Sequence, residues 1–310
     1  MIPPTPDNSS LTQDIGKRQV HRPLIPDRSR SFFAMEVRIG EPAQSVLVDV
    51  DTGSKYNWVL GLSGDPGPDA RFYFNVSKSP TFQKGNNSVT WKYGSQRTKW
   101  AMTADEGRDL WSLGGKTLGY MRFGVSSGGP FPFNRGILGL SFPDPASKTD
   151  SLLDKLVVAR MTQSRAYSID IGPTSRNKGF ITFGGVDTAK FTGPLQKIPV
   201  EDFGRPKPKQ TDCALRNRHD TVDFRFGDFA TIKVPFSDFI ASYRGLKDCI
   251  FGAQLTDGAP ILGRPFLRSA YVVFDQDNRN VHLAQSADCG SALTPITNGS
   301  DAVPAVSGRC

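Results

Sequence analysis

The chain has 310 residues, of which 37% are hydrophobic and 22% are charged, so a sizeable folded core is expected and wholesale disorder is excluded. Its net charge is +8, but the basic residues are spread along the sequence, and the densest basic cluster, at 205–209, lies in a Pro-rich stretch. This pattern favours a solvated linker over a nucleic-acid surface, so we expect no nucleic-acid partner.

Sites for metals and cofactors are not indicated either. The three His and four Cys include no C-x-x-C pair, and no Gly-x-Gly fingerprint for a dinucleotide occurs. No apolar run approaches the roughly 18 residues that a membrane-spanning helix needs. We therefore expect no metal, no cofactor and no transmembrane segment.

The N-terminal residues 1–31 are polar and rich in Pro, Arg and Ser, which predicts a flexible leader. The pair Lys17-Arg18 within it is a candidate processing site. The first residues include no apolar stretch of the signal-peptide kind, so no secretory signal is visible in this chain.

From Phe32 onward the sequence alternates between apolar and polar residues, which is typical of half-buried strands. Strand-like segments are predicted at residues 34–39, 44–50, 88–93, 117–125, 166–171, 179–183, 222–226, 231–234 and 270–275. Only residues 151–161 have clear helical periodicity, and a Pro- and Lys-rich linker follows Pro199 as far as Gln210. These patterns predict an all-β protein with minor helices.

The C-terminal residues 286–310 are rich in Ser, Thr, Pro and Gly, which predicts a stalk or tail. Four N-x-S/T sequences are candidate N-glycosylation sites and fit a secreted protein. They are Asn8, Asn75, Asn86 and Asn298.

One motif carries the chemistry of a catalytic site. An apolar strand runs directly into Asp51-Thr52-Gly53-Ser54, which places a carboxylate at the end of the strand. Gly53 permits a tight turn, and backbone N–H groups with a nearby hydroxyl can then orient the carboxylate of Asp51. An ordinary Asp-Thr-Gly turn is the alternative, and the surrounding motifs decide between the two.

These surroundings resemble the pepsin-like aspartic endopeptidases, most closely the fungal secreted forms, from about Phe32 to Gln285. The resemblance rests on the order and spacing of several segments. They are Asp51-Thr52-Gly53-Ser54 with Trp58-Val59, Gly136-Ile137-Leu138-Gly139-Leu140, Phe180-Ile181-Thr182-Phe183-Gly184-Gly185-Val186-Asp187, Ile261-Leu262-Gly263, and Phe266-Leu267-Arg268-Ser269-Ala270-Tyr271-Val272-Val273-Phe274-Asp275.

The resemblance implies a bilobal β fold with a peptide-binding cleft between the lobes. Each lobe of such a protein supplies one Asp, and the pair activates a water molecule and protonates the peptide carbonyl. On this mapping Asp51 is the catalytic aspartate of the N-terminal lobe, and Thr52, Gly53 and Ser54 form its turn. Trp58 is the supporting aromatic residue, and Tyr93 is the tyrosine of the flap that closes over a peptide or protein substrate.

The second Asp-Thr/Ser-Gly that this chemistry requires does not occur in the chain, because Asp187 and Asp220 precede Thr but lack the Gly. The domain pattern indicates an N-terminal lobe at 32–193 and a truncated C-terminal lobe at 194–285. Only the residues between Val200 and Cys213 stand where the family has several strands and the second turn. The residue after Ile261-Leu262-Gly263 is Arg264, where the family usually has Asp.

We therefore predict an aspartic endopeptidase with impaired hydrolysis. A lone Asp51 held by donors is expected to have a pKa at or below its reference value of about 3.9. Three alternatives stay open. They are a non-catalytic peptide-binding pseudoprotease, an incomplete gene model of an active secreted protease, and, as the least favoured, a homodimer that pairs two Asp51 loops.

The resemblance also implies a disulfide between Cys213 and Cys249, and a secreted or extracellular location. Two free thiols in a cytosolic product are the alternative, which the lack of a visible signal permits. A pairing of Cys289 with Cys310 in the tail is left open.

Overall fold

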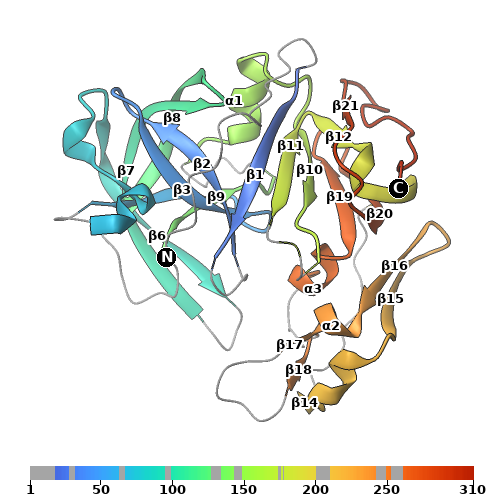
Figure 1. Ribbon diagram of the computed structural model, residues 1–310. Coiled ribbons are helices and arrows are strands. Elements are labelled where there is room, and N and C mark those ends of the chain that lie inside the picture. The colour runs from blue at the N-terminus through green and yellow to red at the C-terminus, as the bar shows by residue number, and fades with distance from the viewer. Residues whose placement is uncertain are drawn as a thin grey trace.

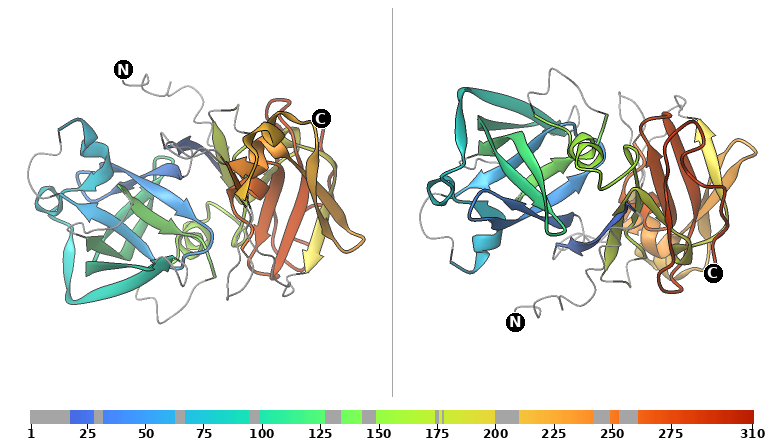
Figure 2. Two further views of the ribbon diagram at one scale, coloured as in Figure 1. Left: turned by 90° about the horizontal axis from the view of Figure 1, so that it is seen from below. Right: turned by 90° about the horizontal axis from the view of Figure 1, so that it is seen from above.

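The computed structural model describes residues 18–27, 32–62, 67–94, 99–126, 134–142, 149–173, 176, 178–199, 210–241, 249–252 and 261–310. These residues form a mostly β protein with two lobes side by side, as Figures 1 and 2 show. Over these ranges no helix has the length and apolarity that a membrane span requires. The Pro- and Lys-rich linker at 200–209 lies outside them.

The first lobe is a twisted sheet folded around apolar side chains of its own strands. Its strands are β2 (Phe33–Ile39), β3 (Gln44–Asp51), β4 (Asn57–Gly61), β5 (Tyr73–Phe74), β6 (Gln83–Gly94), β7 (Lys99–Leu113), β8 (Lys116–Ser126) and β9 (Gly136–Gly139). The predicted helix is present as α1 (Leu152–Val158), which buries Leu152, Leu153 and Leu156 and begins at the N-cap Ser151.

The second lobe is formed around a sheet that continues from the first. Its main strands are β1 (Val20–Pro26), β10 (Ala166–Asp170), β11 (Gly179–Phe183), β13 (Phe191–Pro199), β19 (Ala270–Asp275) and β20 (Asn280–Ser286). The strand order β13-β20-β19-β10-β11-β1-β2-β3-β9 connects both lobes through β1. Residues 166–193, assigned above to the N-terminal lobe, thus supply strands to the shared sheet.

Smaller elements complete the second lobe. They are β12 (Gly185–Asp187), β14 (Gln210–Thr211), β15 (Thr221–Phe226), β16 (Ala230–Pro235), β17 (Ile240–Ala241), β18 (Cys249–Phe251), β21 (Leu293–Pro295), α2 (Phe236–Phe239) and α3 (Arg264–Leu267). β15 and β16 form a two-stranded hairpin, and β14, β17 and β18 form a separate three-stranded sheet. The second lobe therefore has several small sheets beside its part of the shared sheet.

The prediction of a flexible leader is wrong for Val20–Pro26, which form β1 between the two lobes (Figure 1). β1 pairs with β11 from Val20 to Leu24 and with β2 at Ile25 and Pro26. Val20 and Leu24 are buried, at 3% and 2% exposure. Because the apolar residues of β1 are separated by His, Arg and Pro, the composition of this segment concealed a strand.

The prediction of a stalk at 286–310 is also wrong, because these residues fold back onto the second lobe. We call residues 287–310 the C-terminal strap. β21 pairs with β12, and Ile296, Ala302 and Val303 enter a buried cluster with Phe191. This segment has only a few apolar residues among many Ser, Thr and Pro. These few residues are buried because they pack against apolar side chains of the second lobe.

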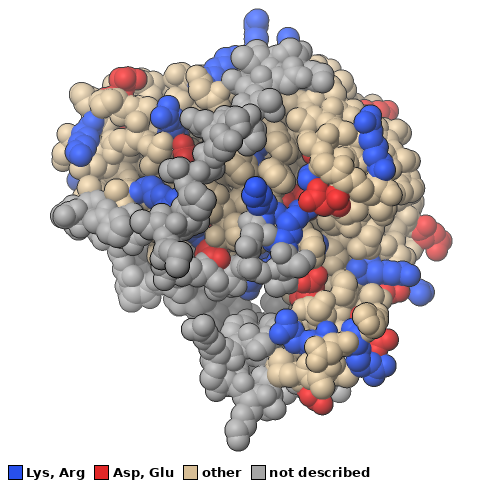
Figure 3. Space-filling view, viewed as in Figure 1, with Lys and Arg blue, Asp and Glu red and all other residues tan. Residues whose placement is uncertain are grey.

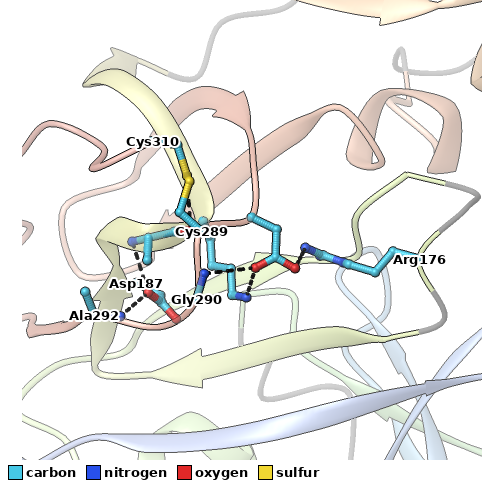
Figure 4. The surroundings of a disulfide bond; sticks show 9 residues. Arg176, Asp187, Cys289, Gly290, Ala292 and Cys310 are labelled. Carbon is cyan, nitrogen blue, oxygen red and sulfur yellow. Dashed lines mark hydrogen bonds and ion pairs between the residues drawn. A yellow bond between two sulfur atoms is a disulfide. The ribbon is translucent and has the colours of Figure 1, made fainter.

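Polar contacts and a disulfide fix the strap to the lobe (Figure 4). Cys289 is bonded to Cys310, and the Asp187 carboxylate accepts a hydrogen bond from Ala292 N at 2.7 Å. Asp288 forms ion pairs with Lys190 and, at 3.1 Å, with Arg176. The strap is therefore attached by a covalent crosslink and by ion pairs in which the exposed Asp288 meets two largely buried cations.

The charged surface in Figure 3 shows basic side chains in several separate places, with acidic side chains beside several of them. This distribution is consistent with the scattered basic residues of the sequence. The expectation of no nucleic-acid partner stays a prediction.

Replacing Cys310 with Ser is expected to lower the free energy of unfolding by about 3 kcal/mol, because the bond closes a loop whose ends are 21 residues apart. Urea denaturation without reductant would measure the change. Ser307→Ala, at an exposed strap position, is the matched control. An unchanged urea midpoint for Cys310→Ser would show that the strap does not depend on the bond.

Candidate active site

Strand β3 positions Asp51 at the end of a buried central strand. β3 lies between β2, with which it runs antiparallel, and β9, with which it runs parallel and aligns Asp51 with Gly139. Its apolar side chains Val46 and Val48 are fully buried. The core thus fixes the strand, and the carboxylate emerges where the strand stops.

The turn after β3 is held by backbone hydrogen bonds on both sides. Gly53 N donates to the Asp51 carboxylate Oδ1 at 2.9 Å, and Leu140 N donates to the Asp51 carbonyl oxygen at 2.9 Å. Ser141 N donates to the carbonyl oxygen of Ser54 at 3.0 Å. Asp51 therefore has one oriented carboxylate oxygen and a main chain fixed to the end of β9.

Position 139 must be glycine, because the main chain of the turn after Asp51 approaches it closely. A Cβ at this position would lie 2.5 Å from Ser54 O and 2.7 Å from Tyr56 N. Only glycine permits this contact between two main chains. The Gly of Ile137-Leu138-Gly139 is thus explained by the turn that carries Asp51.

The pKa of the Asp51 carboxyl is raised, chiefly because burial disfavours its charged form. The backbone N–H groups of Gly53 and Ser54 act in the opposite direction and lower it. The sequence-based expectation of a pKa at or below the reference value is therefore wrong. Desolvation by the surrounding protein outweighs the donors of the turn.

Aromatic side chains from β4 and β6 cover one side of the Asp51 turn. Trp58 Nε1 donates a hydrogen bond to the Tyr93 hydroxyl at 2.9 Å, and Trp58 is fully buried. Burial raises the pKa of Tyr93 to about 12, against hydrogen bonds with Ser54 and Trp58 that lower it. The negative charge of Asp51 also raises this pKa. The structure thus brings Asp51, Ser54, Trp58 and Tyr93 together.

Two further aromatic rings complete this wall. Tyr56 stacks on Trp91 with ring centroids 5.1 Å apart, and it meets Tyr93 edge-on at 6.4 Å. Tyr56 N also donates to the Ser54 hydroxyl at 3.1 Å. Tyr56 was not predicted as a site residue, although its position two residues after Ser54 was a usable signal. Residues 95–98 of the predicted flap lie outside the described ranges.

A buried ion pair beneath Asp51 was also missed. Asp49 lies on the same face of β3 as Asp51, because successive side chains of a strand alternate between its faces. Its carboxylate Oδ1 is 3.0 Å from Arg135 Nε, and both side chains are 5% exposed. Arg135 also lies over the ring of Phe72. Two features of the sequence could have indicated this pair. They are the Asp within the apolar run of β3 and the Arg just before Gly136.

Asp49 is not placed to act as a second catalytic carboxylate. Burial raises its pKa to about 6, while Arg135 lowers it, and Asp27 and Asp51 raise it further. Its side chain is enclosed and paired with a cation, whereas a catalytic acid must reach the substrate carbonyl. Asp49 therefore belongs to the support of the site.

The second Ile-Leu-Gly segment has a very different environment. Ile137 and Leu138 are 3% and 0% exposed and lie in β9, between β3 and β4. Ile261 and Leu262 are 83% and 44% exposed. Within the described part of the chain, no strand pairs with residues 261–263. The second Ile-Leu-Gly segment is thus exposed where the first is buried.

The remaining predicted residues lie in other parts of the structure. Cys213 and Cys249 form a disulfide with their Cα atoms 5.0 Å apart, between a 3₁₀ turn and β18. Asn75 caps another 3₁₀ turn, and its side chain accepts a hydrogen bond from Ser77 N. Asn86 and Asn298 are exposed, and Asn8 lies outside the described residues. In the described ranges, no group of three or more His, Cys, Asp or Glu is arranged to hold a metal ion.

Known proteins match this chain over most of its length. The family model of the eukaryotic aspartyl protease matches residues 32–209 and 206–286. The acid protease of Saccharomycopsis fibuligera is 25% identical over 83% of this chain and 81% of its own length. Secreted aspartic protease 8 of Candida albicans is 26% identical over 82% of this chain and 75% of its own.

A probable aspartic-type endopeptidase of Arthroderma benhamiae is 24% identical over 91% of this chain and 74% of its own length. That alignment is 382 residues long, which exceeds the 310 residues of this chain. The relative therefore has many residues within the aligned region for which this chain has no counterpart.

Asp49 is expected to make the stability of the protein fall as the pH rises from about 4 to about 6. The unfolded chain releases this proton near 3.8, whereas the folded chain retains it to about 6, so ionisation favours unfolding. The loss approaches 3 kcal/mol, because one pKa unit corresponds to about 1.4 kcal/mol. Urea denaturation across this pH range would measure it. In Asp49→Asn, the free energy of unfolding should depend less on pH by this amount. An identical pH dependence in the variant would contradict the assignment of this effect to Asp49.

The Asp49–Arg135 pair is also expected to be strongly coupled. Arg135→Met alone should cost about 3–5 kcal/mol above pH 6, because it leaves a buried carboxylate without its partner. Asp49→Val combined with Arg135→Met should recover most of that loss, because no buried charge remains. A double-mutant cycle by urea denaturation measures the coupling, and additive losses would refute it.

Proposed function

The chain belongs to the eukaryotic aspartyl protease family, and we propose that it binds extended peptides beside Asp51 but hydrolyses them very slowly. The observation that carries this proposal is the contrast between the two Ile-Leu-Gly segments. Ile137 is buried beside the strand that bears Asp51, whereas Ile261 is 83% exposed. The chain retains one half of a two-aspartate site.

The chemistry of the remaining half is that of a single acid–base group. Peptide hydrolysis at such a site needs one carboxylate to take a proton from water and one carboxylic acid to protonate the carbonyl. Asp51 is oriented by Gly53 N and can fill one of these roles at a time. Without a second aspartate, attack of water and protonation of the carbonyl are no longer coupled. Removing one member of such a pair costs several powers of ten in rate.

An internal omission accounts for the loss better than a substitution. The two segments matched by the family model overlap at 206–209, inside the stretch between Val200 and Cys213 in which we place the omission. The alignment that is longer than this chain supports the same interpretation. If the cell makes a protein of this sequence, we propose that it is a pseudoprotease. If an exon has been omitted from the gene model, the protein that the cell makes is an active enzyme.

We also propose that the protein is secreted and glycosylated. The two disulfides favour an oxidising compartment, and the named Candida albicans relative is a secreted protease. Asn86 and Asn298 are exposed and lie in N-x-S/T sequences, so they are the sites that we expect to be modified.

We expect the purified chain to cleave a denatured protein at acid pH several powers of ten more slowly than a two-aspartate relative assayed beside it. Asp51→Ala tests whether any residual cleavage belongs to this site, and pepstatin tests whether it is of the aspartic type. Phe229→Ala, an exposed residue of the β15–β16 hairpin turn, is the matched control.

Three outcomes would change the proposal. Pepstatin-sensitive cleavage at the rate of the relative, lost in Asp51→Ala, would refute the impairment. Activity that rises with the square of the protein concentration would favour pairing of two Asp51 loops in a homodimer. A transcript that carries additional codons between Val200 and Cys213 would identify the sequence as an incomplete gene model.

A further inference from the structure

The two Ile-Leu-Gly segments belong to a short internal repeat, Ile-Leu-Gly-x-x-Phe. It occurs at 137–142 and again at 261–266. The first copy lies in β9, with β3 parallel on one side and β4 antiparallel on the other. The second copy, as far as the structure describes its surroundings, has no strand on either side. The same sequence is thus a central strand in one lobe and an uncovered segment in the other.

The glycines of the two copies, Gly139 and Gly263, have different surroundings. A Cβ at Gly139 would collide with Ser54 O at 2.5 Å, so the first copy needs glycine for the close approach of another main chain. Among the described residues, the nearest atom that a Cβ at Gly263 would meet is Pro265 Cδ at 3.8 Å, and Gly263 has φ −86°. No described contact requires glycine at 263, and its backbone conformation does not require it either. At Gly139 the corresponding position faces main-chain atoms of Ser54 and Tyr56.

The exposed apolar side chains beside Gly263 point to the same missing neighbour. Ile261 and Leu262 are consecutive and are 83% and 44% exposed, whereas Val158 is a single exposed apolar side chain on α1. Scattered apolar residues on a surface are ordinary, but adjacent ones on an extended segment mark an edge that can pair. In the first copy, Ile137 and Leu138 are covered once their neighbouring strands are in place.

We propose that residues 261–263 are a docking edge for an extended apolar peptide that ends in Asp-Thr-Gly. The peptide would add as a parallel strand, in the register that β3 has with β9, so that its Asp comes to lie beside Gly263. This inference rests on the proposed function, because it assigns the partner of the segment that the absent catalytic strand leaves uncovered.

The occupant is a free peptide strand rather than the β3 of a second copy of the chain. β3 of any folded copy is already paired on both sides, with β2 and β9, and its apolar side chains are buried. Withdrawing it would unfold the first lobe. A free peptide that is extended and apolar at alternate positions has no pairing to lose. It can therefore dock at this edge without unfolding the first lobe.

The probe is a fluorescently labelled synthetic peptide with the sequence of residues 44–54, and the readout is its fluorescence anisotropy with the full chain. Wild-type protein should bind it saturably, and a scrambled peptide of the same composition should not bind. Leu262→Asp and Gly263→Val should each weaken binding at least about tenfold, or about 1.4 kcal/mol. Val158→Asp is the matched control and should bind as the wild type does.

Gly263→Val separates docking from folding. The described neighbours leave room for a side chain at 263, and its φ is negative, so the variant should still fold. Because Gly263 is the N-cap of α3 and Val is a poorer N-cap than Gly, a small fall in the urea midpoint is expected. The added side chain would nevertheless fill the approach that the peptide needs. Loss of binding by a chain that still unfolds cooperatively is therefore the expected result.

Several results would overturn the inference. One is the absence of saturable binding, and another is binding that both variants leave unchanged, which would place the peptide elsewhere, for example beside Tyr93. Self-association of the chain that Leu262→Asp abolishes and the peptide cannot displace would assign the edge to a second copy instead. Anisotropy measures binding and involves no cleavage. Absence of peptide binding would therefore refute this inference alone, whereas full protease activity of the chain would refute the proposed function.

Discussion

The parallel pairing of β3 with β9 is the interaction on which the site depends. It aligns Asp51 with Gly139 and lets Leu140 N hold the Asp51 carbonyl oxygen, so the carboxylate leaves a rigid strand end. The absence of a side chain at Gly139 brings the two main chains close enough for this lock. The buried pair of Asp49 and Arg135 joins the same two segments one step earlier along the strands. The site is thus preorganised by main-chain contacts, and its aromatic wall only completes it.

The second Ile-Leu-Gly segment has no such pairing among the described residues. Its Ile261 and Leu262 are exposed, and the chain continues directly into α3. The rest of the second lobe is held by the strap, the shared sheet and the Cys213–Cys249 disulfide. In the proposed function, peptide binding and peptide hydrolysis therefore separate, because binding can use the ordered surface beside Asp51 while hydrolysis needs a second acid.

Much of the first lobe was predictable from sequence, because alternating apolar residues and one Asp-Thr-Gly turn report directly on strands and on a turn. The strand expected at 44–50 is β3, and the helix expected at 151–161 is α1. β1 and the strap were missed because they bury only a few apolar residues against surfaces that other segments create. The ion pair of Asp49 and the raised pKa of Asp51 were missed for a related reason, since burial is a property of the assembled lobe.

Amide hydrogen exchange of the two Ile-Leu-Gly segments can decide whether the second lobe lacks the pairing that the first lobe has. Each segment would be followed in the same folded sample, so differences in solvent and overall stability cancel. We expect slow exchange at residues 137–139, which lie within a sheet, and exchange at least about a hundredfold faster at 261–263. Equal protection of both segments would mean that a strand covers the second one, and a site with a single aspartate would then be the wrong description of this protein.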